Sequence, residues 1–126
     1  MRITTILTAA IALSAIAMPA GAKGPAFQLN NTSWSFVDPD KKVKAHESID
    51  GSGNYIENAV SGKHIDHGTA VMKGDKACFT SAMTKEGEMC WTTRPTKIGQ
   101  SMVTTNDKGR KLRVTRMKYV PMSMPK

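Results

Sequence analysis

Three histidines, His46, His64 and His67, are the side chains in this sequence best suited to binding a metal. Two of them stand in the run His64-Ile65-Asp66-His67, which places imidazole and carboxylate groups close together. Residues three positions apart on a β-strand point to opposite faces, so His64 and His67 should diverge. His64 and Asp66 share a face, but two ligands without a third make a poor metal site. We therefore expect surface histidines, with no metal site and no cofactor.

Methionine is frequent, with nine residues in the chain. Thioethers are good ligands for Cu(I), and the run Met122-Ser123-Met124 places two of them on the same side of an extended chain. The other methionines are spread along the sequence, where methionine commonly fills gaps in a core. The C-terminal tail, with Pro121 and Pro125, should fray. A methionine-based copper carrier is therefore an alternative that we do not favour.

The sequence carries no recognisable catalytic motif. It has no G-x-S-x-G, no H-E-x-x-H, no Gly-rich phosphate-binding loop and no ordered Ser-His-Asp set. Aspartates stand in turn-forming stretches, for example Asp38, Asp50 and Asp107, where this residue type stabilises tight turns. We expect that the protein is not an enzyme.

Positive charge is concentrated near the C-terminal end of the chain. On a strand, Lys111 and Arg113 share one face, whereas Arg110 and Arg116 lie on the other with Leu112. Such a basic strand can dock a polyanion, or it can simply protect a solvent-exposed sheet edge from pairing with another chain. The predicted anion-binding residues are Lys108, Arg110, Lys111, Arg113, Arg116 and Lys118.

The two cysteines, Cys78 and Cys90, are predicted to form one disulfide. Their separation of 12 residues, without a C-x-x-C motif, does not indicate a redox-active pair. If residues 76–82 and 86–92 form an antiparallel hairpin that turns at Thr84, Cys78 faces Cys90 within disulfide reach. The predicted role of this disulfide is structural.

The first 22 residues have the layout of a bacterial Sec-type signal peptide. One positive charge, Arg2, precedes an apolar run over residues 6–17, and Ala20 and Ala22 supply the small residues of a cleavage site between Ala22 and Lys23. Cleavage there leaves residues 23–126 as one domain, in the periplasm or outside the cell. No other stretch approaches 18 apolar residues, so the mature protein should not span a membrane.

Charge and size narrow the classes of function. The chain has 18 Lys and Arg against 10 Asp and Glu, a formal net charge of +8. Together with export, a single small domain excludes a multidomain enzyme, an integral membrane protein and a cytoplasmic nucleic-acid binder. The expected partner is an anionic component of the cell envelope or an envelope protein.

Turn-forming residues recur at nearly even spacing and predict an all-β fold. Between the turns apolar residues alternate with polar ones, as in half-buried strands. Short connections favour an antiparallel meander, closed into a small lipocalin-like barrel or folded into a sandwich. Residues 43–49 could instead form a short helix. The expected domain is 32–120, between tails 23–31 and 121–126, and its eight predicted strands are 32–37, 43–49, 54–60, 64–72, 76–82, 87–93, 99–105 and 111–119.

The run GTAVMKGDKACFTSAMTKEGEMCW, residues 68–91, resembles a pattern in small secreted proteins of Gram-negative bacteria, in which G-T-W is followed by D/G-K-x-C-F and then by C-W or C-Y. The preceding DGSGNY resembles their G-x-Y strand, and the likeness covers about residues 32–117. The resemblance implies an all-β periplasmic domain with a disulfide and no known activity. The sequence departs from the pattern at Ala70, where a tryptophan is usual, which leaves Trp34 and Trp91 as the large rings, expected in the core.

The leading prediction is a non-enzymatic periplasmic or secreted interaction module whose basic strand docks an anionic partner. Three alternatives remain. A lipocalin-type carrier of a small ligand would need a solvent-connected cavity inside the barrel. A secreted protein inhibitor would present the loop 83–88. A copper carrier would use methionine.

Overall fold

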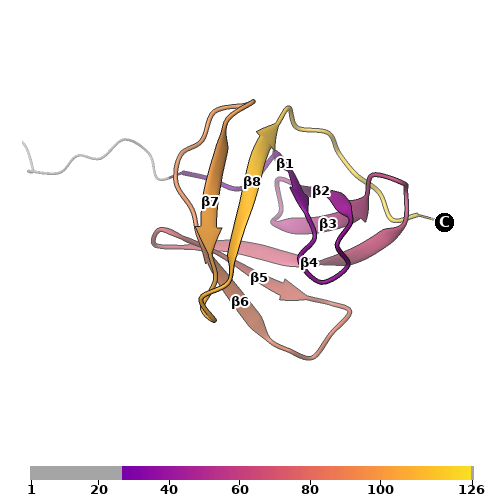
Figure 1. Ribbon diagram of the computed structural model, residues 1–126, viewed down its shortest axis with the longest axis horizontal. Helices are drawn as coiled ribbons and strands as arrows, with labels where there is room; N and C mark the ends of the chain where they lie inside the picture. The colour runs from indigo at the N-terminus through magenta and orange to yellow at the C-terminus, as the bar shows by residue number, and fades with distance from the viewer. Residues whose placement is uncertain (1–26, 126) are drawn as a thin grey trace, which may run out of the picture.

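The structure is a computed structural model that describes residues 27–125. The predicted signal peptide and its cleavage position at Ala22 and Lys23 lie outside the described residues. Residues 27–125 contain eight strands and no helix (Figure 1). The strands are β1 (Thr32–Val37), β2 (Lys44–Ile49), β3 (Asn54–Ala59), β4 (His64–Lys73), β5 (Lys76–Ser81), β6 (Glu88–Thr92), β7 (Ser101–Thr105) and β8 (Lys111–Met117).

All eight strands belong to one antiparallel sheet that curls into a nearly closed barrel. Their order is β6-β5-β4-β3-β2-β1-β8-β7, so each strand lies beside its neighbours in sequence and β8 pairs with β1. The seam between β6 and β7 has one β-bridge, Trp91 to Asn106, and is closed by further hydrogen bonds. The Cys90 amide donates to Asp107 Oδ2 at 3.1 Å, and the Thr104 hydroxyl donates to the Thr92 carbonyl at 2.6 Å. The predicted barrel is confirmed, and the sandwich alternative is not what the chain adopts.

The predicted strands agree with the observed ones to within two residues at each end. The segment 43–49, for which a helix was the alternative, forms strand β2. Ala45 and Ile49 are fully buried on its inner side, while Lys44 is exposed. Residues of this segment pair with β1 on one side and with β3 on the other, which identifies a strand and excludes the helix.

The core fills part of the barrel and centres on Trp34. It joins Trp34 and Ile49 from neighbouring strands with Tyr55, Met102 and Val114. Leu29, which precedes β1, is also buried, at 4% exposure. Small residues complete the inner wall where strands curve most closely: Ala45, Ala59, Ala70 and Ala77 are all buried.

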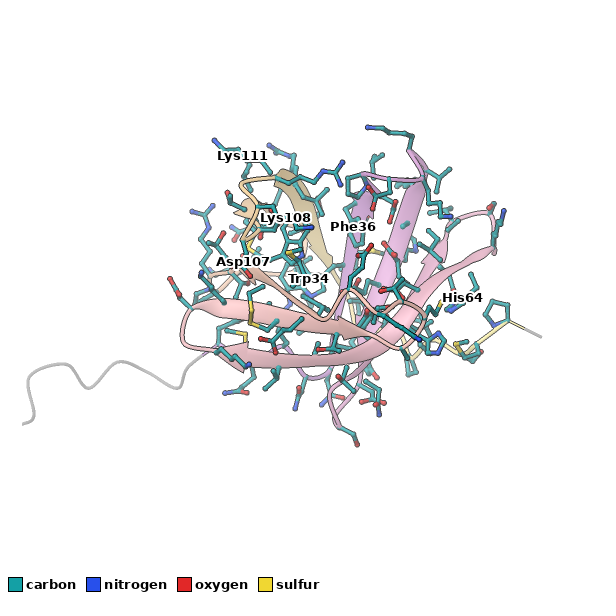
Figure 2. All side chains as sticks on the ribbon, turned by 90° about the horizontal axis from the view of Figure 1, so that it is seen from below. Trp34, Phe36, His64, Asp107, Lys108 and Lys111 are labelled. Carbon is teal, nitrogen blue, oxygen red and sulfur yellow. A yellow bond between two sulfur atoms is a disulfide. The ribbon has the colours of Figure 1, made fainter. Side chains whose placement is uncertain are left out.

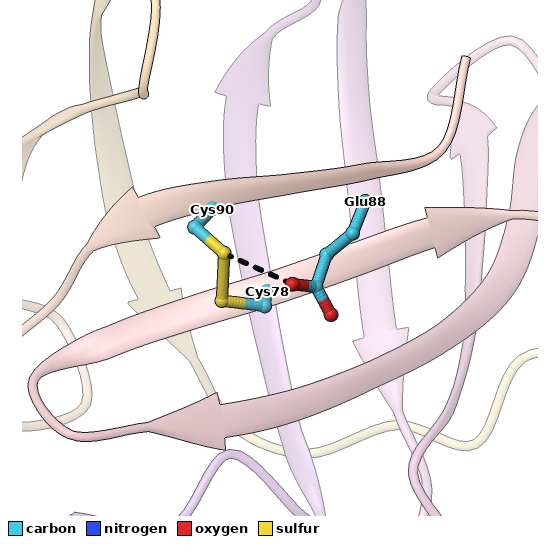
Figure 3. Close-up of side chains that lie close together, drawn as sticks. All are labelled: Cys78, Glu88 and Cys90. Atoms are coloured by element: carbon cyan, nitrogen blue, oxygen red, sulfur yellow. Dashed lines mark hydrogen bonds between the residues drawn. A yellow bond between two sulfur atoms is a disulfide. The ribbon is translucent and has the colours of Figure 1, made fainter.

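The predicted disulfide between Cys78 and Cys90 is confirmed (Figure 3). The two residues are directly opposite in the β5–β6 hairpin, and their Cα atoms are 4.0 Å apart. Glu88 Oε1 lies 3.6 Å from Cys90 Sγ. Because both sulfurs are bonded to each other, this group of side chains offers no thiolate to a metal.

The C-terminal tail lies against the outer side of the barrel. Ser33 Oγ accepts a hydrogen bond from the Val120 amide at 3.0 Å, and Ser48 Oγ donates to the Val120 carbonyl at 2.8 Å. Asn58 Nδ2 donates to the Ser123 carbonyl at 3.4 Å. Val120 ends the predicted domain and Ser123 belongs to the predicted tail 121–126, so the prediction that the tail frays is wrong for residues 121–123. Within the described residues no helix is long and apolar enough to cross a membrane.

Candidate ligand-binding cavity

A cavity of about 940 Å³ occupies the barrel interior and opens to solvent. Aromatic side chains form much of its wall, contributed by strands on several sides of the barrel: Trp34, Phe36, Tyr55, Phe79 and Trp91. Figure 2 shows Trp34 and Phe36 between the strands, with Asp107 and Lys108 on the same side of the barrel. Trp34 thus belongs both to the core and to the cavity wall. Part of the barrel is therefore open to solvent, while Met102 and Val114 pack with Trp34 as core.

Three carboxyl groups stand side by side on the inner wall of the barrel. Trp34 is paired with Glu47, Glu47 with Glu57, and Glu57 with Asp66, across strands β1 to β4. Directly opposite residues of neighbouring strands point to the same side of a sheet, with their Cβ atoms about 5 Å apart. All three carboxyl groups line the cavity. The register of the sheet therefore builds an acidic row that starts beside a tryptophan ring.

The three carboxyl groups of this row differ in how many hydrogen bonds they accept. Asp66 Oδ2 accepts from the Tyr55 hydroxyl at 2.7 Å, and Asp66 Oδ1 accepts from the Ser81 hydroxyl at 2.6 Å. Among the described residues no group donates a hydrogen bond to the Glu47 carboxyl, and no Lys or Arg forms an ion pair with any of the three carboxyls. Glu47 keeps part of its surface accessible because it faces the cavity.

Burial changes the acidity of the row. Burial first, and then the charges of Asp66 and Asp38, raises the pKa of Glu47 to about 8. Burial first, and then the charge of Glu47, raises the pKa of Glu57 to about 9. Burial and the hydrogen bond to Asp66 also raise the pKa of Tyr55. Both shifts favour the protonated, uncharged form of the two glutamates at neutral pH.

Acidic residues gather at this cavity. Eight of the ten Asp and Glu line it, although the chain as a whole carries +8. Asp38, Glu47, Glu57 and Asp66 are buried or half-buried, whereas Asp40, Glu86, Glu88 and Asp107 are exposed. Among the exposed acids, Asp40 is paired with Arg110 and Glu88 is paired with Lys73. Only three Lys or Arg belong to the lining, namely Lys41, Lys108 and Arg110. Four carboxyl groups thus lie on the cavity wall of a protein whose formal net charge is +8.

The six predicted anion-binding residues lie at different places on the structure. Lys108 and Arg110 lie at the cavity opening, where Arg110 Nη1 pairs with Asp40 Oδ1 at 2.8 Å. Lys111 and Arg113 are exposed on the outer face of β8, and Lys118 is exposed beyond it.

Arg116 points to the other side of β8 and is only partly exposed. Its Nη1 donates to the Thr96 carbonyl at 2.8 Å, and its guanidinium carbon lies 5.8 Å from the centre of the Phe27 ring. The six side chains therefore do not form one patch.

The prediction that His64 and His67 diverge is wrong. The β3–β4 pairing shifts between Glu57, which faces Asp66, and Asn58, which faces His64. One extra residue in β4 forms a β-bulge there, and such an insertion breaks the regular alternation of faces. As a result His64 Nε2 and His67 Nδ1 are 3.0 Å apart.

Sequence reasoning missed the acidic row because it treated carboxylates as turn residues. A signal was present: Glu47 stands two positions from both Ala45 and Ile49, and Glu57 stands between Tyr55 and Ala59 in the same way. A glutamate in the apolar phase of an alternating strand points into the interior. That rule identifies Glu47 and Glu57 but cannot show that they are neighbours.

Compared with models of protein families, with curated proteins and with solved structures, the chain matches none of them. The geometry of the cavity is therefore the basis for assigning a function.

Proposed function

We propose that this protein is a non-enzymatic carrier that binds a small ligand inside the barrel, and that the ligand combines an apolar body with a positively charged amine. One observation carries the proposal: a cavity of about 940 Å³ holds a row of buried carboxyl groups that no cation of the described residues neutralises. With the predicted signal peptide, the site of action is the periplasm or the exterior of the cell.

The size and wall of the cavity support an apolar ligand body. Pockets for small molecules typically measure about 300–1,000 Å³ and are lined by aromatic and aliphatic side chains with a few polar groups. Here Phe36, Phe79 and Trp91 provide flat apolar surface around the opening and the interior. A ring or short alkyl chain would displace water from these surfaces, which favours binding.

The carboxyl row supports an amine on the ligand. Burying an ionisable carboxyl without a counter-charge is unfavourable, and such a group stays protonated instead. An ammonium group placed beside Glu47 and Glu57 would favour their ionised forms, because it would form ion pairs with the two carboxylates. The attraction in these ion pairs is stronger in a region of low dielectric than in water. Binding of the amine would then release a proton from the row.

The outward basic residues offer less support for docking an anionic partner. Lys111 and Arg113 remain available for it on β8, but Arg110 is paired with Asp40 and Arg116 is engaged by Thr96. Exposed lysines and arginines are also the common protection of a strand surface. For the inhibitor alternative, the loop 83–88 is exposed, with Met83 at 53%. Nothing else distinguishes that loop.

The carrier proposal is tested by titrating the protein with 2-phenylethylammonium and with its neutral counterpart 2-phenylethanol at pH 8. The readout is the pair of tryptophan indole N–H signals in the NMR spectrum, because the chain has two tryptophans and both line the cavity. We expect both compounds to shift these signals, with the amine binding at least ~10-fold more tightly, which corresponds to about 1.4 kcal/mol.

The matched variants are Glu57→Gln and Asp75→Asn. Gln resembles a protonated glutamate, so Glu57→Gln should fold, lose most of the preference for the amine and still bind the alcohol. Asp75 is an acid outside the cavity, so Asp75→Asn should bind like the wild type. If neither compound moves an indole signal, or if the alcohol binds as tightly as the amine, the proposal is wrong.

A further inference from the structure

A second cluster of chemically active side chains lies outside the barrel cavity, on strands β3 and β4. His64 Nε2 and His67 Nδ1 are 3.0 Å apart, and their ring centres are 5.2 Å apart. Both rings are partly exposed, so an ion in solvent can reach them. Two imidazole nitrogens that bind one ion at about 2.0–2.1 Å can have such a separation. The β-bulge therefore creates a pair of metal ligands that a regular strand would not.

Asn58 orients the first histidine for this role. Its Oδ1 is 2.7 Å from His64 Nδ1, and an amide oxygen only accepts hydrogen bonds, so His64 Nδ1 carries the proton. The lone pair of His64 then lies on Nε2, which faces His67 Nδ1. Metal-binding histidines typically donate their second ring N–H to an oxygen in this way. The hydrogen between the two rings therefore belongs to His67 Nδ1. When a metal binds there, this proton would leave Nδ1 and the neutral ring would carry its proton on Nε2, so that Nδ1 presents a lone pair to the metal.

The same asparagine also holds the C-terminal tail. Asn58 Nδ2 donates to the Ser123 carbonyl, and Ser123 stands between Met122 and Met124. Because Val120 is bound by residues of β1 and β2, and Ser123 by a residue of β3, the tail crosses the strands toward β4. Figure 1 shows the yellow tail running toward the β3–β4 turn, and Figure 2 shows His64 beside its end. Met122 and Met124 therefore flank a tail residue that is bound by the hydrogen-bond partner of His64.

We propose that this face binds one Cu(I) ion through His64 Nε2, His67 Nδ1 and a thioether of the tail, from Met122 or Met124. The types of ligand indicate which metal binds. Thioethers are soft ligands that select Cu(I), whereas imidazoles also bind zinc and Cu(II). Asn58 is a positioning residue, since it holds both His64 and the tail without touching the ion. This site is independent of the cavity, because Asn58 and Glu57 are successive residues of β3 and point to opposite sides of the sheet.

The proposal is tested by a competition titration of the purified protein with Cu(I) against the chromophoric chelator bicinchoninate, with ascorbate as reductant. We expect one equivalent of Cu(I) to bind. The variant with His64→Gln and His67→Gln should bind Cu(I) at least ~100-fold more weakly, since losing a ligand or its support costs this order of affinity. Met122→Leu combined with Met124→Leu should weaken Cu(I) binding at least ~10-fold and change Zn(II) binding less than twofold.

Two controls keep the result interpretable. Met83→Leu removes an exposed methionine of the β5–β6 loop and should leave Cu(I) affinity unchanged. Thermal unfolding of each variant should match the wild type without metal, because the substituted side chains lie on the outer side of the barrel. Cu(I) affinity that is insensitive to the histidine substitutions would overturn the site. A Cu(I) affinity that does not change when Met122 and Met124 are both replaced by leucine would overturn the copper assignment. Tighter binding of Zn(II) than of Cu(I) would also overturn it.

Discussion

Glu47 and Glu57 are the residues that most clearly set this barrel apart from a simple folded scaffold. They occupy inward positions where a valine or leucine would fill the space and add hydrophobic stabilisation. Instead, both glutamates face the cavity with no basic partner among the described residues. Residues that break a local rule of folding are commonly found at functional sites. The acidic row is therefore the feature that a function has to explain.

The raised pKa values of the glutamates predict how stability depends on pH. In the folded protein their pKa values are about 8 for Glu47 and about 9 for Glu57, against 4.5 for an ordinary glutamate. Below pH 4.5 the folded and unfolded states hold the same protons on these groups. Above it the unfolded state ionises first, so the free energy of unfolding falls with rising pH until the folded pKa is passed, by up to about 1.4 kcal/mol per pH unit for each group.

Denaturant unfolding at pH 5, 6.5 and 8 measures this slope. We expect the protein to be less stable at pH 8 than at pH 5, and Glu57→Gln to reduce the loss, because that variant has one titrating group fewer. Asp75→Asn should retain the wild-type slope. Stability that is constant or increases over this range would show that the glutamates are not protonated in the folded state.

Gly68 is required by the close approach of strands β4 and β5. A Cβ atom added at this position would lie 2.0 Å from the Thr80 carbonyl oxygen and 3.0 Å from the Ala82 amide nitrogen. Because both contacts are with backbone, the strands themselves would have to move apart. The hydrogen bond from Ser81 to Asp66 spans the same two strands.

Gly68→Ala should therefore lower the free energy of unfolding by about 2 kcal/mol or more, through strain at a fixed backbone contact. Gly51→Ala is the matched control, because a Cβ atom added at Gly51 would have a side-chain atom of Asn31 as its nearest neighbour, at 3.4 Å. This substitution should lower the free energy of unfolding by less than about 1 kcal/mol. Both are measured by denaturant unfolding. Equal costs at the two positions would contradict the close packing described here.

The disulfide joins the hairpin that borders the barrel seam. β6 carries Trp91 of the cavity wall, and at the seam it is joined to β7 by one β-bridge and by a few hydrogen bonds that involve side chains. Replacing Cys78 and Cys90 together by alanine should lower the free energy of unfolding by about 3 kcal/mol, the value for closing a loop of this length. Dithiothreitol should have the same effect on the wild type and none on the variant. A variant as stable as the oxidised wild type would disprove this role.

Local sequence signals predicted most of the elements. Turn residues such as Gly74 and Gly87, together with alternating apolar residues, mark each hairpin, and the position of Thr84 fixes the register that places Cys78 opposite Cys90. The β-bulge beside His64 was missed because it depends on how β3 pairs with β4. The docking of the tail was missed for a similar reason, since Ser33 and Ser48 reach Val120 across 87 and 72 residues.

The whole molecule separates its charges. Eight of ten acids line the cavity, while the net charge of +8 leaves the cations mostly on the outside. A cavity with walls of low dielectric and an excess of one charge concentrates ligands of the opposite charge. The sequence alone, read as a chain with a basic C-terminal strand, points to an anionic partner. The fold adds a feature that this pattern does not reveal, because it places four carboxyl groups that are scattered in the sequence on one cavity wall: Asp38, Glu47, Glu57 and Asp66.

The pH dependence of amine binding tests the carrier proposal most directly. If 2-phenylethylammonium binds by displacing a proton from the carboxyl row, its affinity should rise by up to about tenfold per pH unit between pH 6 and pH 8, below the folded pKa values of Glu47 and Glu57. The affinity for 2-phenylethanol should stay constant over the same range. An amine affinity that does not change with pH, or that changes in parallel with that of the alcohol, would contradict a cation site at the row.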